Sequence, residues 1–153
     1  MRQTGFYIDA NLLVLLVVGS VGKYLISKHR RLRRFSHDDY DTLTGMIAKV
    51  DQVFVTPNTL TETSNLLAQH KDPERSLFFR RLRFVIEESE EVVVASKTAS
   101  RNNSFLRLGL TDAALLEAIT EERPLITVDL DLYLAATAKG RQTAMNFTHL
   151  QHL

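Results

Sequence analysis

The sequence predicts an α/β fold in which helices cover both faces of a mainly parallel β-sheet. Short apolar segments rich in β-branched residues alternate along the chain with longer stretches of helical periodicity, an order typical of βαβ units. Connections between parallel strands are expected to be right-handed crossovers. Polar residues follow several strand segments, and in an open parallel sheet the carboxyl ends of the strands form the edge where ligands bind.

The composition is that of an ordinary globular domain. The 153 residues are 44% hydrophobic and 24% charged, with a formal net charge of +1 and no cysteine. This length fits one domain spanning residues 1–153. The absence of cysteine excludes disulfides, thiolate catalysis and cysteine zinc sites, and it fits a cytoplasmic protein.

The first part of the chain predicts a strand, a buried helix and a basic helical segment. The first strand is expected at Gly5–Ile8, directly before Asp9. Residues Ala10–Val18 are apolar on all sides, which predicts a buried helix. The run is shorter than the roughly 20 residues that a membrane span needs, so the alternative to a buried helix is an anchor at the membrane interface. An extended basic helical segment is expected at about 20–50, with a basic helix at Lys23–Arg34 and another helix near Tyr40–Val50.

The middle of the chain repeats the pattern. Val53–Val55 is expected to be a second buried strand, and Pro57 suits the first turn of the helix after it. The segments that follow are a helix at Thr59–Gln69, a helix from Asp72 to about Glu88, a strand or connector at Val92–Val94 and a helix at Ser96–Leu108.

The stretch Leu108–Asp131 joins an amphipathic helix to a buried strand. Thr111 and Asp112 open the helix, and Pro124 lies beyond its end because the residue before a proline avoids the α region. Leu125–Val128 is short and apolar, as in a central strand of a parallel sheet. A helix at Leu132–Ala138, ended by Gly140, and a strand at Ala144–Phe147 complete the expected fold.

Four carboxylates are expected at the carboxyl edge of this sheet: Asp9, Glu62, Asp112 and Asp129. Each alone could be a solvated side chain or a helix cap, which stabilises a helix by about 1 kcal/mol. Gathered at one edge, the four would repel one another and have raised pKa values unless a cation neutralised them. Oxygen-only ligands select hard ions such as Mg²⁺ or Mn²⁺, and carboxylate-bound metals hydrolyse phosphodiesters.

Blocks spread over nearly the whole chain resemble the PIN-domain ribonuclease family: FYIDANLL, TPNTLTETSNLL, GLTDAALLEAI, PLITVDLDL and AKGRQTAMNF. The resemblance implies a Rossmann-like, three-layer α/β/α sandwich and an Mg²⁺- or Mn²⁺-dependent endoribonuclease with one or two ions. Carried over by position, the catalytic, metal-binding residues would be Asp9, Glu62, Asp112 and Asp129, and the residues that orient ligands or substrate would be Asn11, Thr127 and Asp131.

The resemblance also implies partners. Small members of the family are often toxins of toxin–antitoxin pairs and often dimerise, so we expect an RNA substrate, an antitoxin or other inhibitor protein and a homodimer, with no membrane span. The chain departs from compact members in the longer, more apolar segment between Asp9 and Val53, and Ala95–Leu108 matches poorly.

Basic residues are concentrated between Lys23 and Arg34, with no acid among them. Such a run is either a solvated face or a surface for the phosphates of RNA. The predicted RNA-binding residues are Arg30, Arg31, Arg33 and Arg34, with Arg80, Arg81 and Arg83 as further candidates or as the solvated face of a helix.

Three functions are compatible with these observations. The first is an endoribonuclease in which metal-activated water cleaves RNA, leaving a 5′-phosphate and a 3′-hydroxyl as the resemblance implies. The second is a non-catalytic PIN-like module that binds RNA or a protein, since a fold does not guarantee an activity. The third is a phosphotransfer enzyme with Asp9 as nucleophile; it fits less well, because Asn11 stands where such enzymes usually have a second Asp.

Overall fold

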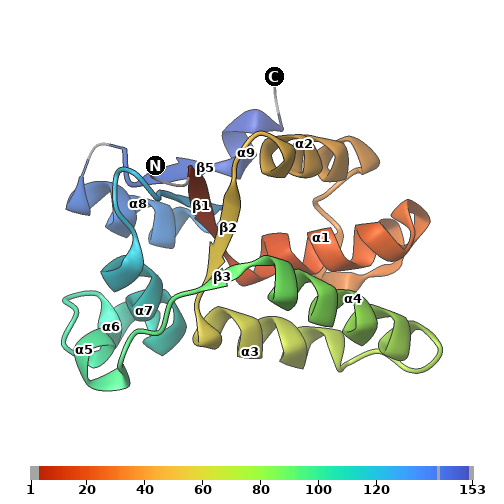
Figure 1. Ribbon diagram of the computed structural model, residues 1–153, viewed down its shortest axis with the longest axis horizontal. Coiled ribbons are helices and arrows are strands. Elements are labelled where there is room, and N and C mark those ends of the chain that lie inside the picture. Colours follow the sequence, from red (N-terminus) through yellow and green to blue (C-terminus); the bar gives the residue numbers. More distant parts are fainter. Residues whose placement is uncertain (1–3, 141, 152–153) are drawn as a thin grey trace.

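A five-stranded parallel sheet lies at the centre of the computed structural model, which describes residues 4–140 and 142–151 (Figure 1). The strands are β1 (Gly5–Ile8), β2 (Gln52–Val55), β3 (Glu90–Glu91), β4 (Leu125–Thr127) and β5 (Ala144–Asn146). Their order is β3-β2-β1-β4-β5, and each neighbouring pair is parallel. The predicted α/β class and three-layer α/β/α sandwich are confirmed.

The alternation of side chains in β1 divides the core between the two faces of the sheet. Phe6 and Ile8 point into a core shared with α1 (Ala10–Val21), α2 (His37–Ala48), α3 (Pro57–Leu67) and α4 (Glu74–Glu88). Tyr7 points the other way, into a core shared with α7 (Leu110–Ala118) and α8 (Leu130–Lys139). The short helix α9 (Phe147–Leu150) lies beside α2 (Figure 1).

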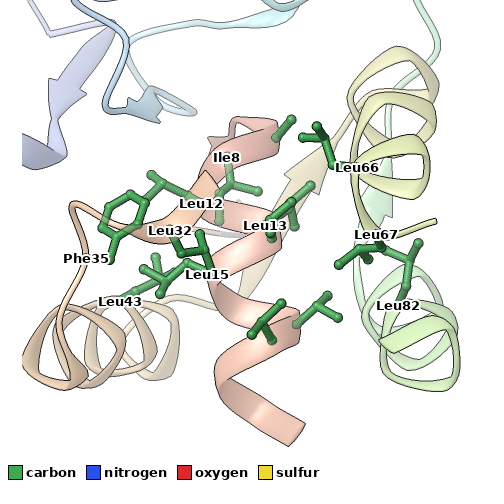
Figure 2. Packing of buried hydrophobic residues seen from close by; sticks show 14 of the residues in the cluster. Ile8, Leu12, Leu13, Leu15, Leu32, Phe35, Leu43, Leu66, Leu67 and Leu82 are labelled. Carbon is green, nitrogen blue, oxygen red and sulfur yellow. The ribbon is translucent and has the colours of Figure 1, made fainter. Parts of the chain in front are cut away.

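Helix α1 forms the centre of the larger core, as predicted for its apolar run. Leu12, Leu13 and Leu15 are completely buried, and leucines from α3 and α4 lie on one side of the helix (Figure 2). Among the described residues, no helix is long and apolar enough to cross a membrane.

The predicted basic helix at Lys23–Arg34 is wrong. The structure has two short 3₁₀-helices, η1 (Lys23–Lys28) and η2 (Arg30–Leu32), separated at His29, whose backbone is extended (φ −87°, ψ 123°). The buried His29 ring accepts a hydrogen bond from the Arg31 backbone N–H (3.1 Å), which caps η2 and prevents a continuous helix. The segment at about 20–50 therefore contains 3₁₀-helices before α2.

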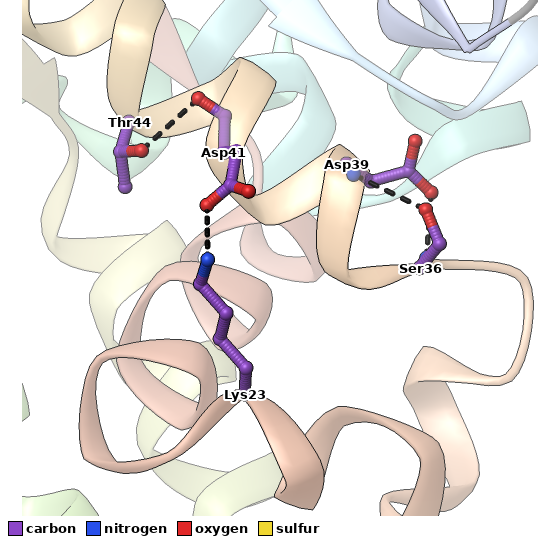
Figure 3. A network of polar contacts seen from close by, with 5 residues as sticks. All are labelled: Lys23, Ser36, Asp39, Asp41 and Thr44. Carbon is purple, nitrogen blue, oxygen red and sulfur yellow. Dashed lines mark hydrogen bonds and ion pairs between the residues drawn. The ribbon is translucent and has the colours of Figure 1, made fainter.

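Polar contacts fix α2 on this segment (Figure 3). Ser36 and Asp39 form a capping box, so the helix begins at His37, earlier than predicted. The Lys23 ammonium group pairs with the Asp41 carboxylate at 2.6 Å and ties η1 to α2.

Two further elements differ from the prediction. The helix expected at Ser96–Leu108 is divided into α5 (Ser96–Ser100) and α6 (Phe105–Leu108), because the Asn102 side chain accepts a hydrogen bond from the Ser104 N–H (2.8 Å) and forms a turn. The strand β3 precedes the predicted Val92–Val94, although the Val92 N–H still donates to the Val55 carbonyl (2.8 Å).

Candidate active site

The carboxyl edge of the sheet is lined by polar side chains that cap the following helices. Asp9 accepts a hydrogen bond from the Leu12 N–H (3.1 Å), Thr56 from the Thr59 N–H (3.2 Å) and Asp129 from the Leu132 N–H (3.2 Å). The chain continues from β1 to one side of the sheet and returns through β4 on the other side. Asp9 and Asp129 follow these two strands, at the switch point where open α/β sheets bind ligands.

Asp9 is the buried member of this edge, with 5% of its surface exposed. One carboxylate oxygen accepts the bond from Leu12, and the other accepts hydrogen bonds from the Thr127 hydroxyl and the Val128 N–H (3.3 Å). Burial raises the pKa of Asp9 although these donors favour the charged form. The position of the side chain is therefore fixed from two directions.

Thr127 links two of the predicted acids. Its fully buried hydroxyl donates to Asp9 and accepts a hydrogen bond from the Asp129 N–H at 3.0 Å. Thr127 therefore sets the position of Asp9 and the backbone from which the exposed Asp129 side chain extends.

Asp112 lies in the first turn of α7 and interacts electrostatically with the other three predicted acids. Burial, Asp129, Glu62 and Asp9 together raise the pKa of Asp112 to about 7. The structure therefore brings Asp112 near Glu62 of α3, Asp9 after β1 and Asp129 after β4.

The turn before α7 requires a glycine. Gly109 has a φ of 88°, in the left-handed region that disfavours other residues, and it accepts the first backbone hydrogen bond of α7 from the Ala113 N–H (3.0 Å). This turn joins α6 to α7, whose first turn contains Asp112.

The donor chemistry of the four acids fits a hard divalent cation, since the ligands are oxygens and their mutual repulsion would be relieved by positive charge. Their side chains do not form a finished coordination set. Within residues 4–140 and 142–151, no group of three or more His, Asp or Glu side chains could hold a metal ion as they stand.

The remaining predicted residues differ in their exposure. Asn11 is half-buried in the first turn of α1, and Asp131 is exposed in the first turn of α8. The predicted RNA-binding arginines, Arg30, Arg31, Arg33 and Arg34, are all exposed.

The basic segment approaches the carboxyl edge through its apolar residues. Leu32 and Phe35 pack beside Leu12 in the first turn of α1 (Figure 2), and the Phe35 ring meets Phe147, which follows β5, with centroids 6.2 Å apart. Arg81 instead lines a cavity that reaches Gln52 at the beginning of β2. Arg83 lines a different cavity, beside Thr61 and Ser64 of α3, the helix that carries Glu62.

Sequence reasoning missed Asn146 and Thr56. Asn146 is buried at the end of β5, beside Thr127 in the sheet register, and its side chain accepts from the Thr148 N–H at 2.9 Å. Asn146 is the last residue of β5 and caps the next helix, as Asp9 caps α1, but the strand was expected to extend to Phe147. Arg141 of the AKGRQTAMNF block lies outside the described residues.

The fold and this edge define a parallel α/β domain with carboxylates at its switch point. No family model matches the chain, and no curated protein sequence matches it. Among solved structures, the chain is similar to the crystal structure of PAE2754 from Pyrobaculum aerophilum, with a TM-score of 0.58 and 18% sequence identity over 96% of this chain and 92% of that chain. At this identity the similarity concerns the fold alone.

Proposed function

We propose that the protein is an Mg²⁺- or Mn²⁺-dependent endoribonuclease in which Asp9, Glu62, Asp112 and Asp129 hold one or two ions. The observation that carries the proposal is the raised pKa of Asp112, which results from burial and from the three other acids. Burial and neighbouring negative charges make the ionised form of this carboxyl group unfavourable at neutral pH. A bound divalent cation would stabilise the ionised form.

The residues of the chain have separate roles in this proposal. When bound, the metal would polarise the scissile phosphate and lower the pKa of the attacking water. Thr127 holds Asp9 in place, and the N-termini of α1 and α8 face the edge with positive dipoles that favour an anionic backbone. Asn11 and Asp131 would orient the substrate, and Arg30, Arg31, Arg33 and Arg34 would bind RNA phosphates.

An inhibitor protein such as an antitoxin, a homodimer and a cytoplasmic site of action belong to the same proposal, and they depend on the sequence resemblance. The second candidate is a non-catalytic module that binds RNA or a protein. It is favoured by the absence of a finished three-ligand set among the described side chains.

Cleavage of structured RNA by the purified chain tests the proposal. We expect cleavage with Mg²⁺ or Mn²⁺, none with EDTA, and products with 5′-phosphates. Asp9→Asn and Asp112→Asn should each lower the rate by about 100-fold or more, since they remove metal ligands.

Asp38→Asn is the matched control, because Asp38 is an exposed acid in the first turn of α2. Cleavage that persists at the wild-type rate in Asp112→Asn would contradict the proposal. Metal-independent RNA binding without turnover would instead support the non-catalytic module.

A further inference from the structure

A cavity of about 720 Å³ lies on the side of the sheet to which Tyr7 points, the side covered by α7 and α8. Its wall combines the polar side chains of Tyr7, Thr120 and Arg123 with the apolar side chains of Val92 and Ala118. Sites for small molecules are typically cavities of roughly 300–1,000 Å³ in which apolar walls surround a few polar groups. The size and the lining of this cavity are therefore those of a site for a small molecule.

The Arg123 side chain is held in place, but its charge has no partner. Its guanidinium group lies over the buried Phe54 ring, with the central carbon 4.2 Å from the ring centroid. The Arg123 N–H donates to the Thr120 hydroxyl (3.0 Å) and the Thr120 N–H to the Arg123 carbonyl (3.1 Å), so the turn that carries the arginine is closed. Among the described residues, the guanidinium group has no hydrogen-bond or ion-pair partner. Its N–H donors are therefore available to a ligand.

Tyr7 supplies a second donor to the cavity. Its hydroxyl group makes no hydrogen bond within the part of the chain that the structure describes. In that part, His29 Nε2 is the one fully enclosed side-chain polar atom without a partner, so the Tyr7 hydroxyl must reach the cavity that Tyr7 lines. Burial raises the pKa of Tyr7, although the positive charge of Arg123 opposes this shift. The hydroxyl group therefore keeps its proton at neutral pH and can donate it to a ligand.

We propose that this cavity binds a small molecule with an oxyanion head group, a carboxylate or a phosphate, and an apolar body. The Arg123 guanidinium group binds the head group through paired N–H donors, and the hydroxyl groups of Tyr7 and Thr120 donate to the same oxygens. Val92 and Ala118 contact the apolar body. An anion is the ligand that this site selects, because it supplies both the missing counter-charge of the arginine and the missing acceptor of the tyrosine.

The cavity is separate from the acids at the carboxyl edge. Arg123 precedes β4 whereas Asp129 follows it, so the two residues lie at opposite ends of this strand. Thr4, which also lines the cavity, and Asp9 flank β1 in the same way. Among the described lining residues the one acid is Glu122, which is exposed and already has an interaction partner. The inference therefore does not rest on the proposed function.

NMR titration of the full chain, in EDTA and at constant ionic strength, tests the site. Benzoate and phenyl phosphate carry the two head groups on the same apolar body, and benzamide carries that body without a charge. We expect at least one of the two anions to cause saturable shifts in the amide signals of Val92, Thr120 and Arg123 below about 10 mM, and benzamide to bind at least about tenfold more weakly. The two anion affinities show which head group the cavity prefers.

Substitutions assign the binding to these side chains. Arg123→Gln should weaken anion binding by at least about tenfold, and Arg123→Lys by less, because lysine keeps the charge but loses the paired donors. Tyr7→Phe should weaken it by about three- to tenfold without loss of the fold, because the hydroxyl group has no partner in the chain to lose.

The matched control is Arg101→Gln, which removes an exposed arginine that lines a different cavity and should bind like wild type. Circular dichroism shows which variants are folded. Three results would overturn the proposal: no saturable shift with either anion, equal affinities for benzamide and the anions, or wild-type affinity in folded Arg123→Gln or folded Tyr7→Phe.

Discussion

At the scale of single residues, Asp112 binds a proton more tightly in the folded protein than in the unfolded chain. Its pKa is raised from 3.8 to about 7, first by burial and then by Asp129, Glu62 and Asp9. The stability that this group contributes is therefore complete below the unfolded pKa and is lost as pH rises through about 7. The negative charge destabilises the metal-free fold in slightly alkaline solution.

We predict that Asp112→Asn stabilises the metal-free protein at about pH 8 by about 1–2 kcal/mol, after allowance for solvent screening, and has little effect at about pH 4. Urea denaturation in EDTA at both pH values measures the difference. Asp38→Asn, at an exposed position, should show neither effect. Equal stabilities of wild type and Asp112→Asn at the higher pH would contradict this account.

His29 has the opposite dependence on pH. Its ring is 3% exposed and lies against His70, with centroids 4.4 Å apart, and its Nε2 has no hydrogen-bond partner among the described residues. Burial, His70 and Arg31 lower the pKa of His29 from 6.5 to about 4. The stability it contributes is present above pH 6.5 and is lost as pH falls towards 4.

We predict that the stability advantage of wild type over His29→Asn shrinks by about 2 kcal/mol between about pH 7.5 and about pH 4.5. Asparagine can keep the acceptor for the Arg31 N–H but cannot be protonated in this range, so the comparison isolates the charge on His29. Urea titrations of both proteins supply the measurement. A constant difference across the range would show that His29 does not titrate in this window.

The Thr127 hydroxyl satisfies two groups at once, the Asp9 carboxylate and the Asp129 N–H. Replacement by valine keeps the shape of the side chain but leaves both groups without this partner, so we predict that Thr127→Val lowers the free energy of unfolding by about 1–3 kcal/mol at neutral pH. Thr127→Ser retains the hydroxyl and should lose less. Chemical denaturation of the two variants decides the point, and a larger loss for serine would refute the role of the hydroxyl.

At the scale of elements, α1 supplies more of the core than its length suggests. Leu13 is completely buried, while Leu134 in α8 leaves 53% of its surface exposed. We predict that Leu13→Ala destabilises the protein by about 3–4 kcal/mol through lost burial and a residual cavity. Leu134→Ala should change stability by less than about 0.5 kcal/mol. Thermal or urea unfolding of this pair compares the same chemical change in two environments.

The elements that could be predicted from the sequence are those with a strong local pattern. The strand predicted at Gly5–Ile8 and the buried helix predicted after it are both present in the structure. The break at His29 could not be foreseen, because it depends on a ring buried against His70, far along the chain. The strand β3 consists of two exposed glutamates, which disfavour strands, and pairs only because β2 provides an edge.

In the candidate site, too, some features follow from the local sequence and others depend on distant residues. The positions of Asp9 and Asp129 follow from local rules, because each comes after a short apolar strand. The contact between Thr127 and Asp9 joins residues 118 positions apart, and the pKa of Asp112 depends on acids from three other parts of the chain. Such effects appear only when the strand order brings these parts together.

At the scale of the whole molecule, the acids connect segments that are distant in sequence. Asp9 precedes α1, Glu62 lies in α3, Asp112 lies in the first turn of α7 and Asp129 caps α8. A cation bound among them would replace repulsion between these elements with attraction, and it would bind the folded protein only. Metal binding and the stability of the whole fold should therefore be coupled.

We predict that Mn²⁺ raises the unfolding temperature of the wild-type protein, with a gain of about 2.7 kcal/mol when the free metal is at about 100 times its Kd. Asp9→Asn and Asp112→Asn should show much smaller shifts because each removes a ligand, whereas Asp38→Asn should respond like wild type. Differential scanning fluorimetry over a Mn²⁺ series, reversed by EDTA, measures the shift without requiring an RNA substrate. An equal shift in wild type and in both ligand variants would mean that Mn²⁺ binds elsewhere, and the role of these acids as a metal site would then have to be abandoned.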